Sequence, residues 1–428
     1  MPVKTYIINV MKINETVRKD GLRIISCYVP HKRTVDVELV ARVGSAYDSA
    51  DKQGLFHCFE HMAFKGTKTR SIDDLQAFSA KNLFGRNAST GTLGTTYEAS
   101  AIDRKLTYAC EYLCDIYLNS IFPAAELERE KRPIFLEIAR QNDNDGRIAM
   151  NALLQCLYRE NPIRDNGGGT VEGVRKITRG DLVIEKMKWH IPSNTVAIAV
   201  GNVDHAHFAK EINKRIPMNF KKVESRQWSD EADEPPVTKQ KTIDRPGREK
   251  SILMLGCKIP KNIDLETLEA LSFFGKLTGG QPGTRLWNEV REKRGLAYTI
   301  GCNTNGNYGL AKYFSVYAEV DPMKIDAVEK IVRRVLSEPV MAKREFENLR
   351  EITRDAFEAT AGEQSGNYES EIWGKIADGE PVKSVETHAK KRLKIIETLN
   401  VKDIDNVRKE LIRPELFARV AVIGRKER

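Results

Sequence analysis

The motif His57-Cys58-Phe59-Glu60-His61 contains the residue types that hold a catalytic metal ion. On a helix, His57 and His61 lie four positions apart and share one face, and Glu60 lies on that face as well. Two imidazoles at this spacing can bind one Zn²⁺ through ring nitrogens, at about 2.0–2.1 Å. The metal would acidify a bound water, from which a neighbouring carboxylate can take a proton. The order His-x-x-Glu-His therefore predicts zinc-dependent hydrolysis with Glu60 as the general base.

A third metal ligand must come from another segment, because a catalytic zinc normally has three protein ligands and one open position. Glu130 and Glu137 are the best candidates, since they are seven residues apart, nearly two helical turns, and would share a face. One would bind the metal while the other orients a histidine. Spacing alone leaves the choice open. Pro133 stands between them, so we expect the helix to bend there or to begin near it.

His205 and His207 form a rival pair of possible metal ligands. Side chains two positions apart share a face only on a strand. No third ligand is apparent near them, and the pair closely follows Gly201. We therefore expect a surface turn at this position rather than a second metal site.

The seven cysteines are scattered along the chain, and Cys110 and Cys114 have the spacing of two core residues on one helix face. The start of the sequence lacks a basic region followed by an apolar core, so we expect no secretory signal. An odd number of cysteines without such a signal predicts reduced thiols and a cytoplasmic location.

Length and composition exclude several classes of protein. A chain of 428 residues is too long for one ordinary core. No stretch of about 18 apolar residues is present, so we expect no membrane span. The net charge of +9 arises from basic residues interleaved with acidic ones, as at residues 128–132. No basic run with aromatic residues occurs, and we expect no binding to nucleic acid.

One pattern occurs twice in the chain. An N-cap residue is followed three positions later by aspartate, then by proline after 11 more residues, and then by a strand rich in Val, Ala and Ile. The members are Thr178, Asp181, Pro192 and residues 195–201, and Asn400, Asp403, Pro414 and residues 417–424. We infer two homologous domains, residues 1–227 and 247–428. The polar, proline-containing segment 228–246 is the expected linker.

Strands and helices mix within the first half. Residues 21–30 and 33–44 have the pattern of two strands in a hairpin. Residues 54–64, 71–83 and 104–121 have the pattern of helices. Because strands do not alternate strictly with helices, the expected fold class is α+β rather than a doubly wound parallel sheet.

Several motifs together resemble those of the inverted-zincin, or pitrilysin-type, zinc metallopeptidases, the family of the mitochondrial processing peptidase and of short bacterial relatives. They are HCFEHMAFKGT at 57–67, the glutamate pair ending at Glu137, IAVG at 198–201 and GGQPGTRLWNEVREKRGLAY at 279–298. The resemblance covers most of the chain. It implies two homologous domains, each an antiparallel-rich mixed sheet packed with helices, that form half of a clamshell.

The resemblance also implies roles for individual residues. His57, His61 and Glu137 would bind one Zn²⁺ per chain, Glu60 would be the catalytic base, and Glu130 would orient a histidine ligand without touching the metal.

Two further motifs concern the substrate. Asn87 and Ala88 match an edge-strand motif that binds the substrate backbone. Arg291 and Tyr298 match a pair that contacts the substrate and its tetrahedral intermediate. A cation and a phenol near the scissile carbonyl would stabilise oxyanion charge.

Family enzymes close two halves around a chamber, and this chain has the length of one half but carries both sets of motifs. We therefore expect a homodimer in which Arg291 and Tyr298 serve the partner's zinc, or else a heterodimer with a related zinc-less subunit. The expected activity is endopeptidase cleavage of short or unfolded peptides by zinc-bound water that Glu60 activates. The alternative is a non-catalytic structural or partner subunit of a peptidase-like complex.

Overall fold

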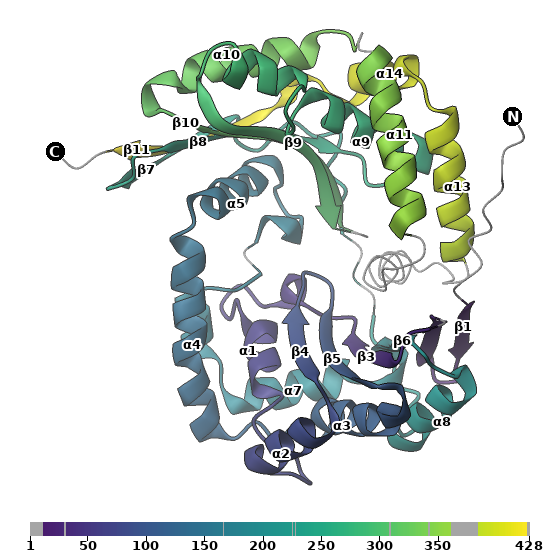
Figure 1. Ribbon diagram of the computed structural model, residues 1–428. Helices are drawn as coiled ribbons and strands as arrows, with labels where there is room; N and C mark the ends of the chain where they lie inside the picture. Colours follow the sequence, from purple (N-terminus) through teal and green to yellow (C-terminus); the bar gives the residue numbers. More distant parts are fainter. Residues whose placement is uncertain are drawn as a thin grey trace, which may run out of the picture. The chain divides into compact units, whose positions relative to one another are not determined.

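The computed structural model describes residues 12–425, apart from a small set of positions. Those positions are Pro30, Asn166, Ser225, Gln227 and residues 308–309, 341–342 and 361–383. The described chain divides into two compact units. The first contains residues 12–139 and 167–226, and the second contains residues 140–165, 228–360 and 386–425. Figure 1 shows each unit as a sheet with its helices.

The first unit contains a six-stranded sheet in the order β1-β2-β6-β3-β5-β4. Its strands are β1 Lys12–Val17, β2 Arg23–Tyr28, β3 Thr34–Ala41, β4 Gly85–Thr90, β5 Thr95–Ile102 and β6 Thr195–Gly201. Neighbouring strands are antiparallel except β2 and β6, which are parallel. All seven residues of β6 are buried, which suits an interior strand covered on both faces. The hairpin predicted for residues 21–30 and 33–44 is therefore wrong, because β6 lies between those two strands.

The second unit repeats this topology in a five-stranded sheet, β7-β11-β8-β10-β9. Its strands are β7 Gln240–Pro246, β8 Ser251–Ile259, β9 Ala297–Asn307, β10 Ala311–Val320 and β11 Ala418–Arg425. Without β1, both sheets place their strands in the order first, fifth, second, fourth, third along the chain, and in both the first and fifth strands are parallel. The two homologous α+β domains predicted from the repeated pattern are confirmed.

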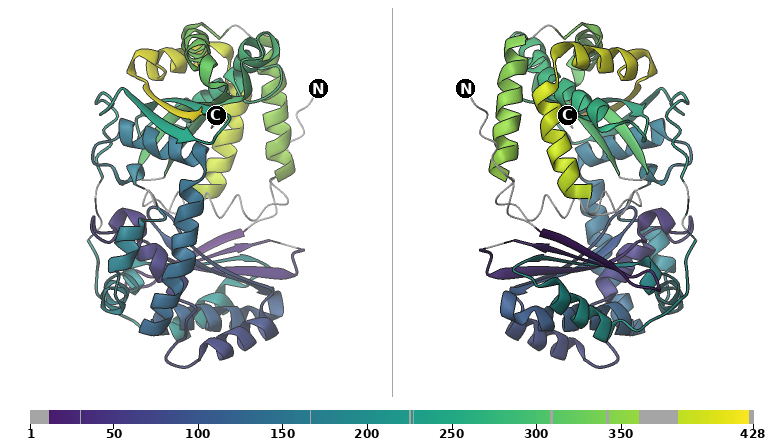
Figure 2. Two further views of the ribbon diagram at one scale, coloured as in Figure 1. Left: turned by 90° about the vertical axis from the view of Figure 1, so that its left-hand side faces the viewer. Right: turned by 90° about the vertical axis from the view of Figure 1, so that its right-hand side faces the viewer.

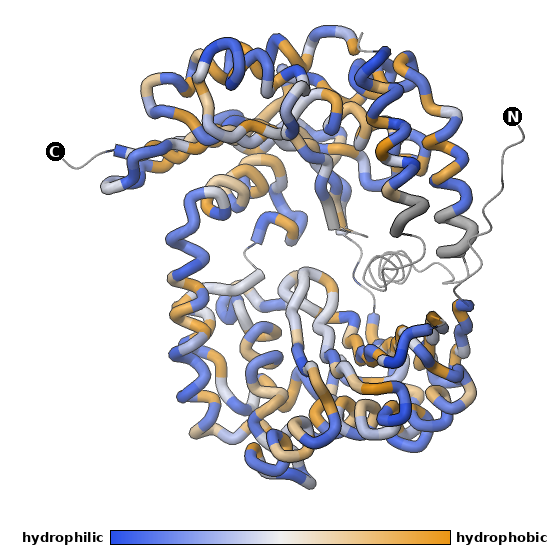
Figure 3. The backbone as a smooth tube through the Cα atoms, viewed as in Figure 1, coloured by the Kyte–Doolittle hydropathy of each residue, from blue (hydrophilic) through white to orange (hydrophobic). Residues whose placement is uncertain are grey.

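Helices pack on one face of the first sheet and on both faces of the second (Figures 1 and 2). In the first unit they are α1 Leu55–Met62, α2 Ile72–Asn82, α3 Leu106–Asn119, α6 Val171–Lys176, α7 Arg179–Trp189 and α8 His205–Arg215. In the second unit they are α5 Asp145–Leu157, α9 Leu265–Thr278, a π-helix Trp287–Glu292, α10 Ile325–Ser337, α11 Lys343–Thr360, α13 Ser384–Thr398 and α14 Val401–Leu411. Helix α4, Ala124–Asn142, continues from one unit into the other. Polar and apolar residues alternate along the helices (Figure 3), and the apolar ones form one main core per unit.

Both predicted capping boxes are present. Thr178 and Asp181 exchange hydrogen bonds at the start of α7, and Asn400 and Asp403 do so at the start of α14. Each box satisfies amide groups that the first helical turn leaves without partners. The repeated pattern therefore has the same local structure in both halves.

Residues 140–165 group with the second unit, which differs from the contiguous first domain expected over residues 1–227. The reason is packing of α5 on the second sheet. A Cβ atom added at Gly256 of β8 would lie 2.8 Å from a terminal methyl group of Leu153 of α5 and 2.9 Å from the carbonyl oxygen of Phe314, so glycine favours this close approach. The Tyr158 hydroxyl then donates to the carbonyl of Lys312 at 2.8 Å. Burial of α5 thus recruits a segment from the first half of the sequence.

The segment expected as a linker, residues 228–246, differs from that expectation in two ways. Residues 240–246 form strand β7. The Glu231 carboxylate accepts hydrogen bonds from the backbone amides of Arg159, Glu160 and Asn161, at 2.6, 3.0 and 2.7 Å. Three convergent amides make a favourable site for an anion. The polar composition of this segment therefore reflects internal hydrogen bonding as well as contact with water.

No helix in the described part of the chain is long and apolar enough to cross a bilayer. All seven cysteines are free and buried. Cys110 and Cys114 lie in the core face of α3, as predicted, and burial raises the pKa of Cys114 to about 12.

Candidate metal centre

Helix α1 carries the His-x-x-Glu-His motif and is held at its first turn by a buried carboxylate. Gly54 is the N-cap residue of this helix and has φ +100°. Glycine has no side chain that could accept hydrogen bonds from the amides of the first turn. The Asp48 carboxylate does so instead, accepting from the amides of Gly54 at 2.7 Å and Phe56 at 3.1 Å. Burial raises the pKa of Asp48 to about 7, against the effect of these amide donors. Asp48 therefore fixes the start of the helix from outside it.

Glycine is required where α1 meets the segment 168–174. A Cβ atom on Gly54 would lie 2.8 Å from Val174, and one on Gly169 would lie 2.3 Å from the Cα of Gly54. Both glycines also have positive φ, which other residues adopt only with strain. This close approach brings the carbonyl of Gly168 to the side of the helix that bears His57.

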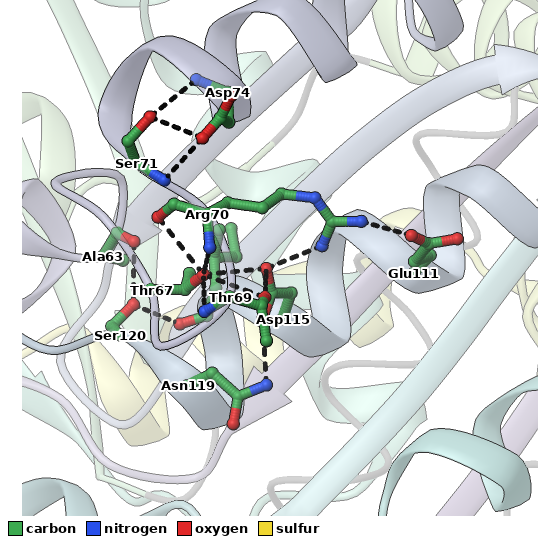
Figure 4. A network of polar contacts seen from close by, with 11 residues as sticks. Ala63, Thr67, Thr69, Arg70, Ser71, Asp74, Glu111, Asp115, Asn119 and Ser120 are labelled. Atoms are coloured by element: carbon green, nitrogen blue, oxygen red, sulfur yellow. Dashed lines mark hydrogen bonds and ion pairs between the residues drawn. The ribbon is translucent and has the colours of Figure 1, made fainter.

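Figure 4 shows the polar network that holds the segment after α1. The Asp115 carboxylate of α3 accepts from Thr67 at 2.9 Å, from Thr69 at 3.0 Å and from Arg70 at 2.8 Å. Burial of Asp115 disfavours its charge, but these hydrogen bonds and one from Asn119 outweigh that effect and lower its pKa. The network attaches the segment after α1 to α3, so α1 is restrained at both ends.

His57, His61 and Glu137 converge on one point. Each offers one ligand atom, and the three atoms lie within 4.8 Å of one another. Glu137 Oε2 lies 3.2 Å from His57 Nε2 and 3.5 Å from His61 Nε2. The two imidazole rings are 4.9 Å apart between centroids. Two nitrogens and one oxygen at this separation match the donor set and size of a zinc site.

The second nitrogen of each histidine is held by a partner behind it. His57 Nδ1 lies 3.2 Å from the carbonyl oxygen of Gly168, which can only accept, so Nδ1 carries the hydrogen. His61 Nδ1 lies 3.2 Å from Glu130 Oε2, and the other oxygen of Glu130 lies 2.6 Å from Lys65 Nζ. Both Nε2 lone pairs are thereby left free for a metal. The sequence suggested Glu130 as such a partner and offered no sign of Gly168.

Glu130 and Glu137 lie on one uninterrupted helix. Helix α4 begins at Ala124 and runs through Pro133 to Asn142, so it does not begin near the proline. Pro133 removes one backbone hydrogen bond. The burial of Ile134 and Ile138 beside it holds the helix against the core of the first unit.

Glu60 lies beside this cluster on α1 and is half-buried. Burial raises the pKa of its carboxyl group, although a hydrogen bond from Thr90 and the nearby His57 act in the opposite direction. The Thr90 hydroxyl donates to Glu60 Oε2 at 2.7 Å. Thr90 ends strand β4, and no pattern in the sequence marks it.

Asn87 and Ala88 lie in β4, which ends the sheet, so the other side of this strand is an edge within the described sheet. Ala88 points into the core, whereas Asn87 is exposed on the opposite face and hydrogen-bonds Glu98. Both residues therefore contribute backbone groups to the edge strand, but only the Asn87 side chain is exposed to solvent.

Arg291 and Tyr298 are neighbours within the second unit. The π-helix places the Arg291 guanidinium 4.0 Å from the centroid of the Trp287 ring. Arg291 also donates to the carbonyl oxygen of Tyr298 at 2.7 Å and lies 5.2 Å from its ring centroid. The Tyr298 side chain is exposed. The stacking partner Trp287 was not predicted.

His205 and His207 lie in the first turn of α8, not in a surface turn. The two nitrogens of His205 contact the hydroxyls of Thr16 at 2.8 Å and Ser26 at 2.9 Å. His207 contacts Thr107 instead. The two imidazoles thus have separate partners, and among the described residues they belong to no cluster that could hold a metal.

Comparison with protein families matches both halves of the chain. Residues 23–169 match the family described as insulinase, peptidase family M16, and residues 176–352 match the peptidase M16 inactive domain. An uncharacterized zinc protease of Streptomyces coelicolor is 30% identical over 333 residues, which cover 75% of this chain and 70% of that protein. An uncharacterized zinc protease of Rickettsia felis is 27% identical over 358 residues, covering 83% and 85%.

Solved structures share the fold. A protease from Helicobacter pylori has a TM-score of 0.84 at 18% identity and covers 97% of this chain and 100% of that one. The periplasmic protease PqqL from Escherichia coli has a TM-score of 0.75 at 17% identity, and the match covers 96% of this chain but 47% of that one. Two repeated α+β domains with a His-His-Glu cluster in the first define the class of inverted zincins. The chain belongs to peptidase family M16, the insulinase type.

Proposed function

We propose that the chain is a zinc-dependent endopeptidase that hydrolyses short or unfolded peptides. The observation that carries this proposal is the convergence of His57, His61 and Glu137, with both Nδ1 atoms held from behind. Relatives named zinc proteases support the same metal and reaction. One Zn²⁺ per chain matches the single such cluster among the described residues.

The residues divide the reaction between them. Zn²⁺ held by the three ligands would supply Lewis-acid polarisation of the scissile carbonyl and would acidify water. Glu60 takes a proton from the attacking water and returns it to the leaving amine. Gly168 and Glu130 keep the Nδ1 hydrogens of His57 and His61 in place, so neither ring turns during turnover.

Strand β4 offers a means of binding peptides with little regard to sequence. It is the terminal strand of its sheet, and an extended peptide can pair with such an edge through main-chain hydrogen bonds. Arg86, Asn87 and Ser89 of β4 are exposed. An unfolded peptide can adopt the extended form that pairing needs, whereas a folded protein cannot, and this favours the proposed substrate class.

The proposed active assembly is a homodimer in which Arg291 and Tyr298 act on peptide bound at the partner's zinc. This chain matches only 47% of PqqL, which supports a second copy in place of a second half. A heterodimer with a zinc-less relative is the alternative. Arg291 would stabilise the developing oxyanion, a role typically worth about 10²–10³-fold in kcat.

Mixing two inactive variants tests the shared site. Homodimers of Glu60→Gln and of Arg291→Ala should each be nearly inactive. After exchange of subunits, the mixture should recover about a quarter of wild-type activity, because half the dimers are mixed and each has one intact site. Peptide hydrolysis measured before and after exchange gives the result.

The control for this experiment is a mixture of Glu60→Gln and Glu137→Ala. Both substitutions change residues of the zinc site itself. In that mixture every shared site lacks a residue of the zinc site, so no activity should return. A mixture of Glu60→Gln and Arg291→Ala that stays inactive, although native mass spectrometry shows mixed dimers, contradicts the shared site.

Glu130→Ala should weaken zinc binding about 10–100-fold, because His61 Nδ1 loses its acceptor and Lys65 loses its partner. Zinc affinity is measured by competition with a chromogenic chelator. Glu128→Ala is the matched control on the same helix, since the Glu128 side chain is mostly exposed. Equal zinc affinity in Glu130→Ala and Glu128→Ala would show that Glu130 does not support His61.

Metal analysis of the purified protein, combined with a peptide-library digest with and without chelator, tests the function as a whole. The expected result is about one zinc per chain and cleavage that chelator abolishes. The name of the second family, an inactive domain, favours a non-catalytic partner subunit as the second candidate. That candidate predicts no chelator-sensitive cleavage by the chain alone.

A further inference from the structure

The Thr90 side chain contacts the proposed general base, Glu60. Its hydroxyl lies 2.7 Å from Glu60 Oε2 and 3.2 Å from the carbonyl oxygen of Phe56. The single hydroxyl hydrogen goes to the carboxylate, which is both nearer and charged. Thr90 is the only residue shown to hydrogen-bond the Glu60 side chain within the described parts of the chain.

The position of Thr90 is set by its strand. It pairs with Thr95 of β5, and the Thr95 hydroxyl is buried and donates to the carbonyl of Val43 at 2.8 Å. Alternation along β4 points Thr90 to the face that carries the helices and its neighbour Ser89 to the other face. The alternation of side chains along the strand therefore directs the Thr90 hydroxyl towards α1.

The turn after Thr90 is hydrogen-bonded to the segment that precedes α1. The carbonyl of Gly91 accepts from the amide of Ser45 at 3.1 Å, and a Cβ atom on Gly44 would lie 2.1 Å from that carbonyl oxygen. Three residues after Ser45, Asp48 holds the first amides of α1. The end of β4 and the start of α1 thus share one support, which sets the separation of Thr90 from Glu60.

We propose that Thr90 is a positioning residue that orients the Glu60 carboxylate and links it to the edge strand that receives the peptide. This proposal rests on the proposed function. A glutamate side chain has three rotatable bonds, and a hydrogen bond to one oxygen removes most of that freedom. A carboxylate held in this way is already placed for proton transfer. The activation barrier of hydrolysis then contains no cost for orienting it.

The test compares Thr90→Val, which keeps the shape of the side chain but removes the donor, with Thr90→Ser, which keeps the donor. Thr90→Val should lower kcat about 10–100-fold with KM changed less than about 3-fold, and Thr90→Ser should recover most of the loss. Thr242→Val is the matched control, because Thr242 is an exposed threonine on β7 in the other unit. Zinc content should be equal in all four proteins.

A second readout does not depend on activity. Crystal structures of the zinc-loaded proteins should show one Glu60 rotamer in wild type and Thr90→Ser, and a second rotamer or weak density in Thr90→Val. Unchanged kcat together with an unchanged Glu60 rotamer in Thr90→Val overturns the proposal. If Thr90→Val lost zinc or failed to fold, Thr90→Ala would be measured in the same two ways. An inactive wild type would instead refute the proposed function, and the rotamer comparison would still test Thr90.

Discussion

Glutamine in place of Glu60 is expected to lower kcat/KM for peptide hydrolysis by about 10³-fold while zinc stays bound at about one ion per chain. The amide has the shape of the carboxylate, and its oxygen can still accept the hydrogen bond from Thr90. It cannot take a proton from water at neutral pH. The change therefore removes the base and little else, and the measurement pairs a fluorogenic peptide assay with metal analysis.

Glu128→Gln is the control for this prediction. Glu128 lies on α4 and its side chain is mostly exposed, with an ion pair to the buried Lys131. The same chemical change there should leave both activity and zinc content at wild-type values. Hydrolysis by Glu60→Gln within a few-fold of wild type would exclude Glu60 as the base.

Glu137→Gln is expected to weaken zinc binding on the order of 10³-fold. The Glu137 carboxylate lies within 3.5 Å of both His57 Nε2 and His61 Nε2, and no other acidic group in the described chain joins this cluster. Binding free energies of about 10–16 kcal/mol for structural zinc imply about 4 kcal/mol per ligand, which is close to 10³-fold in affinity. A neutral amide oxygen is a much poorer ligand than a carboxylate.

The measurement is a zinc titration against a competing chelator, with Glu128→Gln again as the control on α4. Activity of Glu137→Gln should fall at limiting zinc and return in part when zinc is raised. That recovery separates it from Glu60→Gln, which should remain inactive at any zinc concentration. A dissociation constant for zinc equal to that of wild type would remove Glu137 from the ligand set.

Much of this organisation follows from short-range chemistry. The spacing of His57 and His61 places two imidazoles on one face of any helix they occupy. The capping residues Thr178 and Asn400 mark the start of corresponding helices in both halves because an N-cap acts within one turn. The duplication and the α+β class could therefore be predicted from the chain alone.

Pairing of strands was predicted less well because it is a non-local property. Strands β2 and β3 form within the two predicted segments, at Arg23–Tyr28 and Thr34–Ala41, but adjacency along the chain suggested a hairpin. Strand β6, from more than 150 residues later in the chain, lies between them, and all seven of its residues are buried there. A local pattern shows that a strand is apolar and does not show which strands will cover it.

The candidate site divides in the same way. Helical periodicity puts Glu130 and Glu137 on one face of α4. Their separate roles depend on which residues of α4 lie opposite the two histidines of α1. In the folded chain Glu137 meets both Nε2 atoms and Glu130 meets Nδ1 of His61. That arrangement is set by packing of buried residues such as Ile134 and Phe59 in the core.

The supporting groups Asp48, Thr90 and Gly168 are recognisable only after folding. Each acts through one hydrogen bond or a few, and none belongs to a pattern that marks it in the sequence. Gly168 contributes a backbone carbonyl, which every residue possesses. Periodicity and capping reveal which side chains face together on one element, whereas contacts between elements depend on the packing of the whole core, and it is those contacts that complete the site.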